Sequence, residues 1–310
     1  MIGTSMRRVT WTAIAALLVL RPAALESRQF RSSTDVVSVY ATVQDKDLRL
    51  VTNLKKEDFM VYDDGKEQPI TVFSNSVTPF SAVVMLDRSG SMYRHQFLIR
   101  DAAGEFVNRL LPEDVARIGS FGNYVGNRVV ISPPEFTASK PDLLSVLKEP
   151  LRSGQYSPVW IAVDQAIAAL SDRTNRRVIL LFTDGFDEPS ETIRPVKLKD
   201  VIDRVRQNNV MVYALGFADV EQRPDREPKI TKPDPDLRKL ADETGGGYFE
   251  VVDPEMLGSV FSRIADELHQ QYWLGYTPPK NDGKVHTIRV VVKSDRLTVR
   301  ARQSYVATAK

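Results

Sequence analysis

The sequence predicts an α/β fold, a doubly wound and mostly parallel sheet, with short β segments before and after it. Two observations lead to this prediction. Between residues 79 and 269, apolar runs of strand length alternate with helix-compatible stretches, which is the pattern of a parallel sheet covered by helices on both faces. On either side of this range, only short alternating runs separated by turn residues occur, as in antiparallel strands.

The N-terminal flank, residues 28–78, contains strand patterns only. Its predicted strands are 36–43, 59–62 and 69–73, with a hairpin turn at Asp63-Asp64-Gly65 between the last two. The C-terminal flank, residues 270–310, has the same character, with predicted strands at 271–276, 286–292 and 297–302. Small isolated sheets are marginal in water, so we expect the two flanks to pack together into one β module.

The central range, residues 79–269, forms the predicted α/β domain. Its expected strands are 82–87, 115–121, 178–183, 209–217 and 247–252, and its expected helices are 96–110, 140–148, 159–171, 195–207, 235–244 and 254–269. The polar loop 219–235 interrupts this alternation after a strand that should be parallel to the others. It therefore belongs at the carboxyl edge of the sheet, either as part of a ligand surface or as a flexible connection.

The composition is that of an ordinary soluble globular protein, with 42% hydrophobic and 26% charged residues in 310. A formal net charge of +2 gives no reason to expect nucleic acid or an anionic membrane as a partner. The chain has no cysteine, which excludes a cysteine nucleophile, a thiolate zinc site and disulfides.

Residues 1–27 have the pattern of a secretory signal peptide. Arg7-Arg8 precede the apolar stretch 11–20, and small residues suited to cleavage follow. The stretch is shorter than the roughly 20 residues of a spanning helix, although an uncleaved anchor and a twin-arginine signal remain alternatives. We therefore expect a protein that is secreted, periplasmic or held in the cell envelope, with no stable membrane span after cleavage.

The segment Asp87-Arg88-Ser89-Gly90-Ser91 follows the first apolar run of the central range. Its carboxylate and two hydroxyls lie at the carboxyl end of a buried parallel strand, where open α/β sheets hold their ligands. One carboxylate and two hydroxyls suit a hard divalent cation. Taken alone, the pattern is also typical of an Asx-turn or a helix cap.

Two further segments favour the metal-site interpretation. The apolar run 177–182 ends in Thr183-Asp184-Gly185, so Asp184 should emerge at the same edge as Asp87. Between them, Ser157 precedes a helix-compatible stretch. Together, these segments resemble the von Willebrand factor A domain and its metal-ion-dependent adhesion site (MIDAS). The resemblance implies that Asp87, Ser89, Ser91, Ser157 and Asp184 surround one divalent ion, usually magnesium, with manganese or calcium as alternatives. Ser157 stands where the family usually has threonine.

The resemblance extends from about Asp35 to Tyr305. Residues 237–249 look like the helix and glycine turn that lead to the last strand of such domains. The segments 53–65 and 271–278 are similar to those of a bacterial group of exported proteins, many from Acidobacteria, called von Willebrand factor A-related.

The function that this resemblance implies is metal-dependent binding of a protein that offers a Glu or Asp carboxylate to the ion. The alternative is a structural component of the cell envelope in which the ion only stabilises the fold. Enzyme classes are disfavoured, because G-x-S-x-G, H-E-x-x-H and nucleotide-binding glycine motifs do not occur and position 89 is Ser rather than the Asp of D-x-D phosphatases.

Three smaller expectations concern residues outside the predicted ligand set. Asp187 and Glu188 are interpreted as a solvated acidic turn rather than as groups that support the ion. The three histidines, at 95, 269 and 286, are expected at the surface. Tyr272, Trp273 and Tyr276 are expected to pack in the β module, with a carbohydrate platform as the alternative.

Overall fold

The structure is a computed structural model that describes residues 36–122, 129–149, 154, 156–191, 194–221 and 229–308. These residues belong to one unit, Asp35–Lys310. The predicted signal peptide, residues 1–27, lies outside the described residues. Within the described ranges, no helix has the length and apolar character needed to cross a membrane.

A six-stranded sheet with the order β12-β9-β8-β5-β6-β7 forms the centre of the α/β region. All neighbouring strands are parallel except β6 and β7. The strands are β5 (Phe80–Asp87), β6 (Val115–Phe121), β7 (Val130–Thr137), β8 (Arg176–Thr183), β9 (Val210–Phe217) and β12 (Tyr248–Val251). The predicted doubly wound, mostly parallel sheet is thus confirmed.

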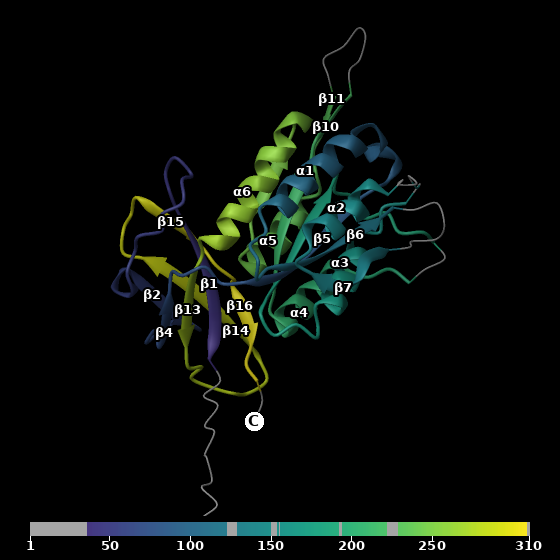
Figure 1. The fold of residues 1–310 in the computed structure, drawn as a ribbon. Helices are drawn as coiled ribbons and strands as arrows, with labels where there is room; N and C mark the ends of the chain where they lie inside the picture. Colours follow the sequence, from purple (N-terminus) through teal and green to yellow (C-terminus); the bar gives the residue numbers. More distant parts are fainter. Residues whose placement is uncertain are drawn as a thin grey trace, which may run out of the picture. The chain divides into compact units, whose positions relative to one another are not determined.

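Helices cover both faces of this sheet (Figure 1). One face packs against α1 (Gln96–Asn108), α2 (Lys140–Lys148) and α6 (Leu257–His269), and the other against α3 (Val159–Ala169), α4 (Leu198–Asn208) and α5 (Pro235–Thr244). In β5, the side chains of Val84 and Leu86 join the first layer, whereas those of Val83 and Met85 join the second. A strand buried on both faces must be apolar at consecutive positions, as this one is.

Local sequence signals set the ends of α5. The Asp234 side chain accepts a hydrogen bond from the backbone N–H of Asp236 at 2.9 Å, and Pro235 occupies the first helical position. Gly245 ends the helix at φ +78°, a left-handed conformation that favours glycine. The helix therefore has the predicted bounds.

Strand β7 was not predicted. It contains Pro133 and Pro134, which cannot donate to a sheet ladder. The structure accommodates them because β7 is the edge strand of the sheet, antiparallel to β6 and with an irregular register between Ala116 and Ile118.

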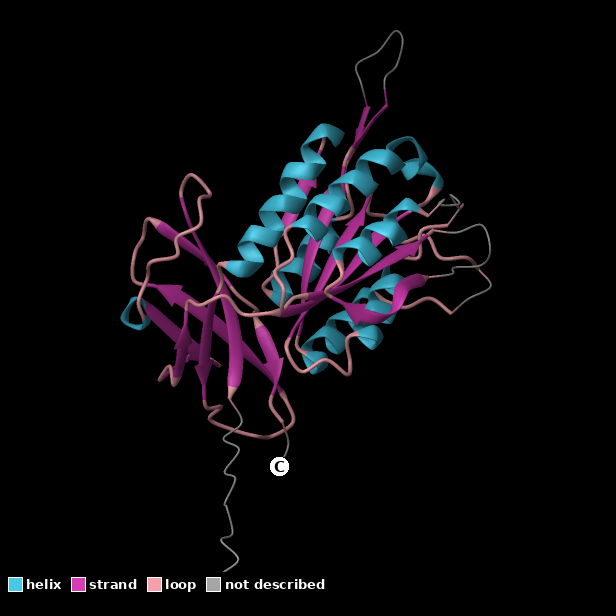
Figure 2. Cartoon of the chain, in the orientation of Figure 1, coloured by secondary structure: helices cyan, strands magenta, loops and turns pink. Residues whose placement is uncertain are grey.

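The two flanks form a β module of two antiparallel sheets, with the orders β15-β1-β13-β4 and β16-β14-β2-β3 (Figure 2). The N-terminal strands are β1 (Val37–Asp45), β2 (Phe59–Asp63), β3 (Lys66–Gln68) and β4 (Val72–Ser74), and the C-terminal strands are β13 (Tyr272–Tyr276), β14 (Val285–Val292), β15 (Leu297–Arg300) and β16 (Ser304–Val306). Each sheet combines strands from both ends of the chain: β1 pairs with β13 and β15, and β2 pairs with β14. One apolar core contains side chains from both flanks.

Two details of the module differ from prediction. Strand β2 forms its hairpin with β3 across Asp64-Gly65, while β4 leaves and pairs with β13. Pro69, which lacks an N–H, follows β3 directly and cannot extend that ladder. Strand β16, which follows a short turn after β15, was not predicted and pairs with β14.

A buried polar network joins the β module to the α/β region. Glu267 of α6 is fully buried and accepts hydrogen bonds from Tyr213 (2.6 Å) and Thr42 (3.1 Å), and it also pairs with Arg300. Since Tyr213 belongs to the α/β region and Thr42 to the module, one carboxylate links the two. The module lies at the end of the sheet where β5 begins and α6 ends (Figure 1).

Three short 3-10 helices complete the described elements: η1 (Lys56–Asp58), η2 (Gly90–His95) and η3 (Pro254–Met256). The polar loop after β9 begins and ends as an antiparallel pair, β10 (Asp219–Glu221) with β11 (Lys229–Thr231), and residues 222–228 lie outside the described residues.

Candidate metal centre

Asp87, the last residue of β5, lies at the centre of the candidate site and is buried. Its Oδ1 accepts a hydrogen bond from the backbone N–H of Ser89 at 2.8 Å. Its Oδ2 accepts from the hydroxyls of Ser157 at 2.8 Å and Thr183 at 2.6 Å. Three chain segments therefore meet at one carboxylate.

The turn after β5 brings the two predicted serine ligands together. The backbone N–H of Arg88 donates to the carbonyl of Phe121 at 2.9 Å, which continues the pairing with β6. Gly122, at φ +88°, lies so close that an added Cβ would be 2.6 Å from the Ser89 nitrogen. Within this turn, the hydroxyl oxygens of Ser89 and Ser91 are 3.0 Å apart.

Ser157 is held in place by its backbone. Its N–H donates to the carbonyl of Glu188 at 3.0 Å, and the Glu188 N–H donates back to the Ser157 carbonyl at 2.8 Å. The Gly154 N–H donates to the Arg88 carbonyl at 3.1 Å. The loop that carries Ser157 is thus attached to both of the loops that carry the predicted aspartates.

Asp184 follows β8 and is partly exposed. Burial, followed by the negative charge of Asp184, raises the pKa of Asp87 to about 6, against hydrogen bonds from Thr183, Ser89 and Ser157 that lower it. The next residue, Gly185, has φ +114°, and an added Cβ would lie 2.5 Å from the Asp234 nitrogen. The end of the polar loop 219–235 therefore packs directly against the Asp184 turn.

Thr183 was missed as a site residue. It is fully buried, donates to Asp87 and accepts a hydrogen bond from the Gly185 N–H at 3.0 Å. The register pairs Leu86 with Phe182, so the next residues, Asp87 and Thr183, end their strands side by side. In the sequence, Asp87 and Thr183 each come directly after an apolar run. This shared position was the signal that could have identified Thr183 as a site residue.

The interpretation of Asp187 as a solvated turn residue was wrong. Its Oδ1 accepts a hydrogen bond from the Trp160 backbone N–H at 3.2 Å, in the first turn of α3, and burial raises its pKa. Asp187 thus caps a helix from a neighbouring loop. Glu188, by contrast, is exposed as expected.

The donor set fits a hard divalent cation. Two oxygens bound to one magnesium at about 2.1 Å and at right angles are about 3.0 Å apart, which is the spacing of the Ser89 and Ser91 hydroxyls. The Ser157 and Thr183 hydroxyls donate their protons to Asp87, so each keeps a lone pair for a cation, although Thr183 uses its other lone pair on the Gly185 N–H. A cation would also relieve the repulsion between Asp87 and Asp184.

The expectation that all three histidines are surface residues was wrong. His286 is buried in the β module: its Nδ1 lies 2.9 Å from Asp63 Oδ1, and its Nε2 lies 3.1 Å from Asp282 Oδ1. Asp63, Asp64 and His286 are close enough to hold a metal ion. However, Asp63 Oδ2 also accepts hydrogen bonds from two tyrosines on β13 and β16, Tyr276 (2.9 Å) and Tyr305 (2.6 Å). We interpret the group as a network that joins strands from the two flanks.

The comparisons with known proteins agree with the fold. The von Willebrand factor type A domain family matches residues 82–263, so the chain belongs to this family. A search of curated proteins finds no match. Among solved structures, the chain is similar to a von Willebrand factor type A protein from Catenulispora acidiphila, with 14% identity and a TM-score of 0.51 over 90% of this chain and 76% of that one.

A second similar structure is proximal thread matrix protein 1 from the mussel byssus, described with a zinc-occupied MIDAS motif. It shares 14% identity with a TM-score of 0.51, over 67% of this chain and 50% of that one. The chain therefore spans half the length of the mussel protein. At these identities, both likenesses concern the fold alone.

Proposed function

We propose that the protein is an exported, metal-dependent binding module that holds a divalent cation, magnesium first, at Asp87, Ser89, Ser91, Ser157 and Asp184. An acidic side chain of a partner protein completes the coordination of the ion. The observation that carries this proposal is the convergence of three separate segments on the buried carboxylate of Asp87, which accepts from the Ser89 backbone N–H and from the hydroxyls of Ser157 and Thr183. Thr183 joins the proposed set.

The charge balance supports a partner carboxylate as the last ligand. Two aspartates neutralise a divalent cation formally, while the remaining groups are neutral hydroxyls that leave the ion electrophilic. Magnesium prefers six oxygens, and an external carboxylate is a suitable additional ligand. We propose binding rather than catalysis.

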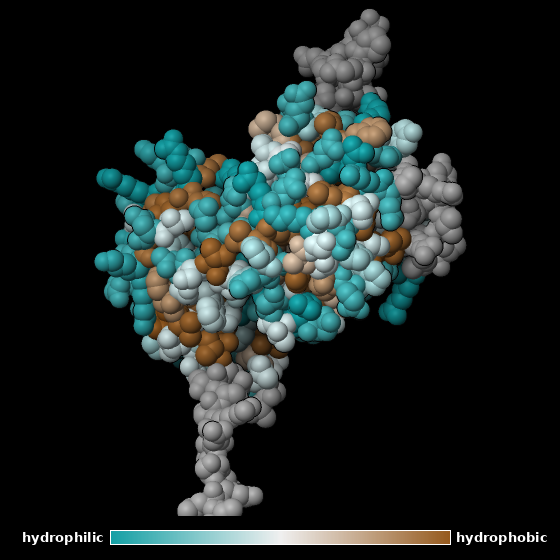
Figure 3. Space-filling model, viewed as in Figure 1, coloured by the Kyte–Doolittle hydropathy of each residue, from teal (hydrophilic) through white to brown (hydrophobic). Residues whose placement is uncertain are grey.

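Exposed aromatic side chains near the site suit a protein partner. Tyr93 and Phe97 follow the Ser89 turn and are 64% and 71% exposed, and Phe186 follows Asp184 and is 47% exposed. Aromatic residues are enriched at protein interfaces. On the face seen in Figure 3, hydrophobic residues form small groups between hydrophilic ones. Recognition through a polar centre with a few aromatic contacts suits such a surface.

The metal proposal is tested by calorimetric titration of the chain with magnesium, manganese and zinc chlorides. Asp184→Asn should lower metal affinity by about a hundredfold or more, because it removes a charged ligand. Asp187→Asn is the matched control: it removes one charge from the same loop and keeps an oxygen that can accept from Trp160. Equal affinities of the Asp184→Asn variant and the wild type would refute the site.

The partner proposal is tested by capture from the cell envelope fraction with the wild-type chain, Asp184→Asn and Asp187→Asn as baits. We expect the captured protein to be lost with a chelator and with Asp184→Asn, and retained with Asp187→Asn. Capture that persists with the chelator, although metal binds in the titration, would favour a structural component in which the ion only stabilises the fold.

Export is tested separately by mass spectrometry of the native protein. The proposal expects an N-terminus between Ala23 and Gln29, as signal cleavage would leave it. An intact Met1 in a cytosolic fraction would contradict export without bearing on the metal site.

A further inference from the structure

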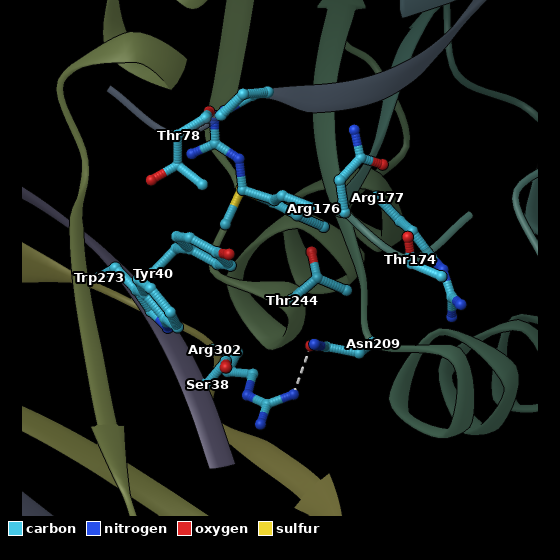
Figure 4. Close-up of a pocket in the computed structure, with 13 residues that line it drawn as sticks. Ser38, Tyr40, Thr78, Thr174, Arg176, Arg177, Asn209, Thr244, Trp273 and Arg302 are labelled. Carbon is cyan, nitrogen blue, oxygen red and sulfur yellow. Dashed lines mark hydrogen bonds between the residues drawn. The ribbon is translucent and has the colours of Figure 1, made fainter. Parts of the chain in front are cut away.

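A cavity lies at the end of the central sheet opposite the candidate metal centre, between the β module and the α/β region. This seam pocket encloses about 330 Å³. The module contributes Ser38, Tyr40, Trp273 and Arg302, and the α/β region contributes Arg176 and Asn209 among others. In Figure 4, Tyr40 and Trp273 lie on one side of the view, and Thr174 and Arg177 on the opposite side.

The seam pocket is basic. Arg176, Arg177 and Arg302 are among the residues that line it, and no Asp or Glu is among its described lining residues. The Arg177 guanidinium already donates hydrogen bonds to the carbonyls of Asn208, Arg173 and Ser171. Arg176 and Arg302 are therefore the arginines that can donate hydrogen bonds to a ligand.

Arg176 and Arg302 each retain a buried donor without a partner. Arg176 uses its terminal nitrogens on Gln271, Thr78 and Leu268, but its Nε has no hydrogen-bond partner, although the residue is only 6% exposed. Arg302 donates to Asn209 through Nη1, and its Nε is likewise buried without a partner. Burial lowers the pKa of Arg302 to about 10, as expected of a guanidinium without a carboxylate partner.

Trp273 adds a third donor of the same kind. Its indole Nε1 is buried and has no hydrogen-bond partner in the described part of the chain. A buried tryptophan N–H normally finds an acceptor. Three residues that line this cavity therefore each have an unpartnered N–H donor, and two of them are cationic. A ligand with hydrogen-bond acceptors and a negative charge would suit such a lining.

Two aromatic side chains that line the cavity further restrict the kind of ligand that it could bind. Tyr40 and Trp273 offer flat faces, and the Arg176 guanidinium already lies over the Tyr40 ring at 4.9 Å. The volume is at the lower end of the range for small-molecule sites. We propose that the seam pocket binds a small organic oxyanion, a single ring that carries a carboxylate or phosphate group, with the oxyanion toward Arg302 and the ring against Tyr40 and Trp273.

This site is independent of the proposed metal centre, because it shares no residue with it. A ligand there would contact both the β module and the α/β region, so it should stabilise their packing. We therefore expect the thermal midpoint of the whole chain to rise with a bound anion.

The test measures thermal midpoint and calorimetric binding of the full chain with benzoate, glucuronate, glucose 6-phosphate and inorganic phosphate at millimolar concentrations, with glucose as the neutral comparison. Arg302→Gln should weaken binding of the ring-bearing anions by about tenfold or more, because it removes a charged donor. Trp273→Phe, which keeps a ring and removes the N–H, should weaken it by a smaller factor. Arg296→Gln, an exposed arginine of the module outside the pocket, should leave it unchanged.

Binding of glucuronate without benzoate would identify a sugar acid as the ligand class, and the reverse would identify an aromatic acid. The proposal is overturned if none of the anions binds, or if affinity is the same in Arg302→Gln and Trp273→Phe as in the wild type. Inorganic phosphate binding as tightly as the ring-bearing anions would also overturn it, since the aromatic walls would then contribute nothing. If Arg302→Gln does not fold, the decision rests on Trp273→Phe.

Discussion

The two ends of the central sheet present opposite chemistry. At the carboxyl end, the buried carboxylate of Asp87 lies near the negative charge of Asp184 and accepts hydrogen bonds from serine and threonine hydroxyls. At the amino end, Arg176, Arg302 and Trp273 line one cavity, and each has a buried N–H donor without a partner among the described residues. The ligands that we propose for the two ends are accordingly opposite in charge, a cation at the carboxyl end and an anion at the amino end.

The two ends also differ in how they are built. The carboxyl end is made by loops of the α/β region alone, each following or preceding a strand or helix of that region. The amino end needs residues from both flanks and from the α/β region, including Tyr40, Arg176 and Trp273. Changes in the β module should therefore affect the amino end and spare the metal centre.

The largest expected effect comes from deletion of residues 271–310. Strand β1 then loses both neighbours, β13 and β15, and β2 loses β14, so the N-terminal flank keeps no stable sheet. We expect limited proteolysis to cleave within residues 36–74 while the α/β region remains intact and still binds magnesium. Protection of the N-terminal flank equal to that in the full chain would show that the flanks are independent.

A single change in the module should be strongly destabilising. Asp63→Ala removes a buried carboxylate and leaves the hydroxyls of Tyr276 and Tyr305 without their acceptor. We expect the free energy of unfolding in urea to fall by about 3–5 kcal/mol, with magnesium affinity unchanged. Asp64→Ala, a change in the adjacent exposed residue, is the control and should cost clearly less. Similar losses for the two variants would rule out the special role of Asp63.

The module should also respond to pH through His286. Burial lowers the pKa of this histidine, but hydrogen bonds to Asp63 and Asp282 and the negative charges of Asp63 and Asp64 raise it overall above its ordinary value of about 6.5. The stabilisation is therefore fully present below about pH 6.5 and is lost as pH rises through the folded-state pKa. Thermal midpoints should show this decline for the wild type and a flatter profile for His286→Gln. Identical pH profiles of the thermal midpoint in the wild type and in His286→Gln would contradict the assignment of this pH dependence to His286.

The smallest effect is expected at Ser157 in the metal centre. Ser157→Thr adds a methyl that restricts the rotamer of the hydroxyl, so magnesium affinity should rise by about twofold. Ser157→Ala should lower affinity without abolishing binding, because the other hydroxyls and both carboxylates remain. Calorimetric titration of the two variants and the wild type with magnesium checks whether affinity falls in the order threonine, serine, alanine at position 157. An alanine variant that binds as tightly as the threonine variant would remove Ser157 from the ligand set.

The sequence by itself determined the parts that depend on local pattern. Apolar runs of strand length predicted β5 and β8, and their direction placed Asp87 and Asp184 at one edge. Asp234, Pro235 and Gly245 determined the ends of α5, because caps act within a few residues. Family resemblance added Ser157, whose side chain reaches Asp87.

Only the tertiary structure decided what depends on pairing between distant segments. The role of Thr183 required the register of β5 and β8, and the pairing of β4 with β13 required the packing of the whole module. His286 is buried against Asp63, and the seam pocket is lined by Tyr40 together with Trp273. Each of these pairs joins positions far apart in the chain. A local pattern gives the period of an element and its buried face, but which elements become neighbours is set by how their apolar faces are buried together.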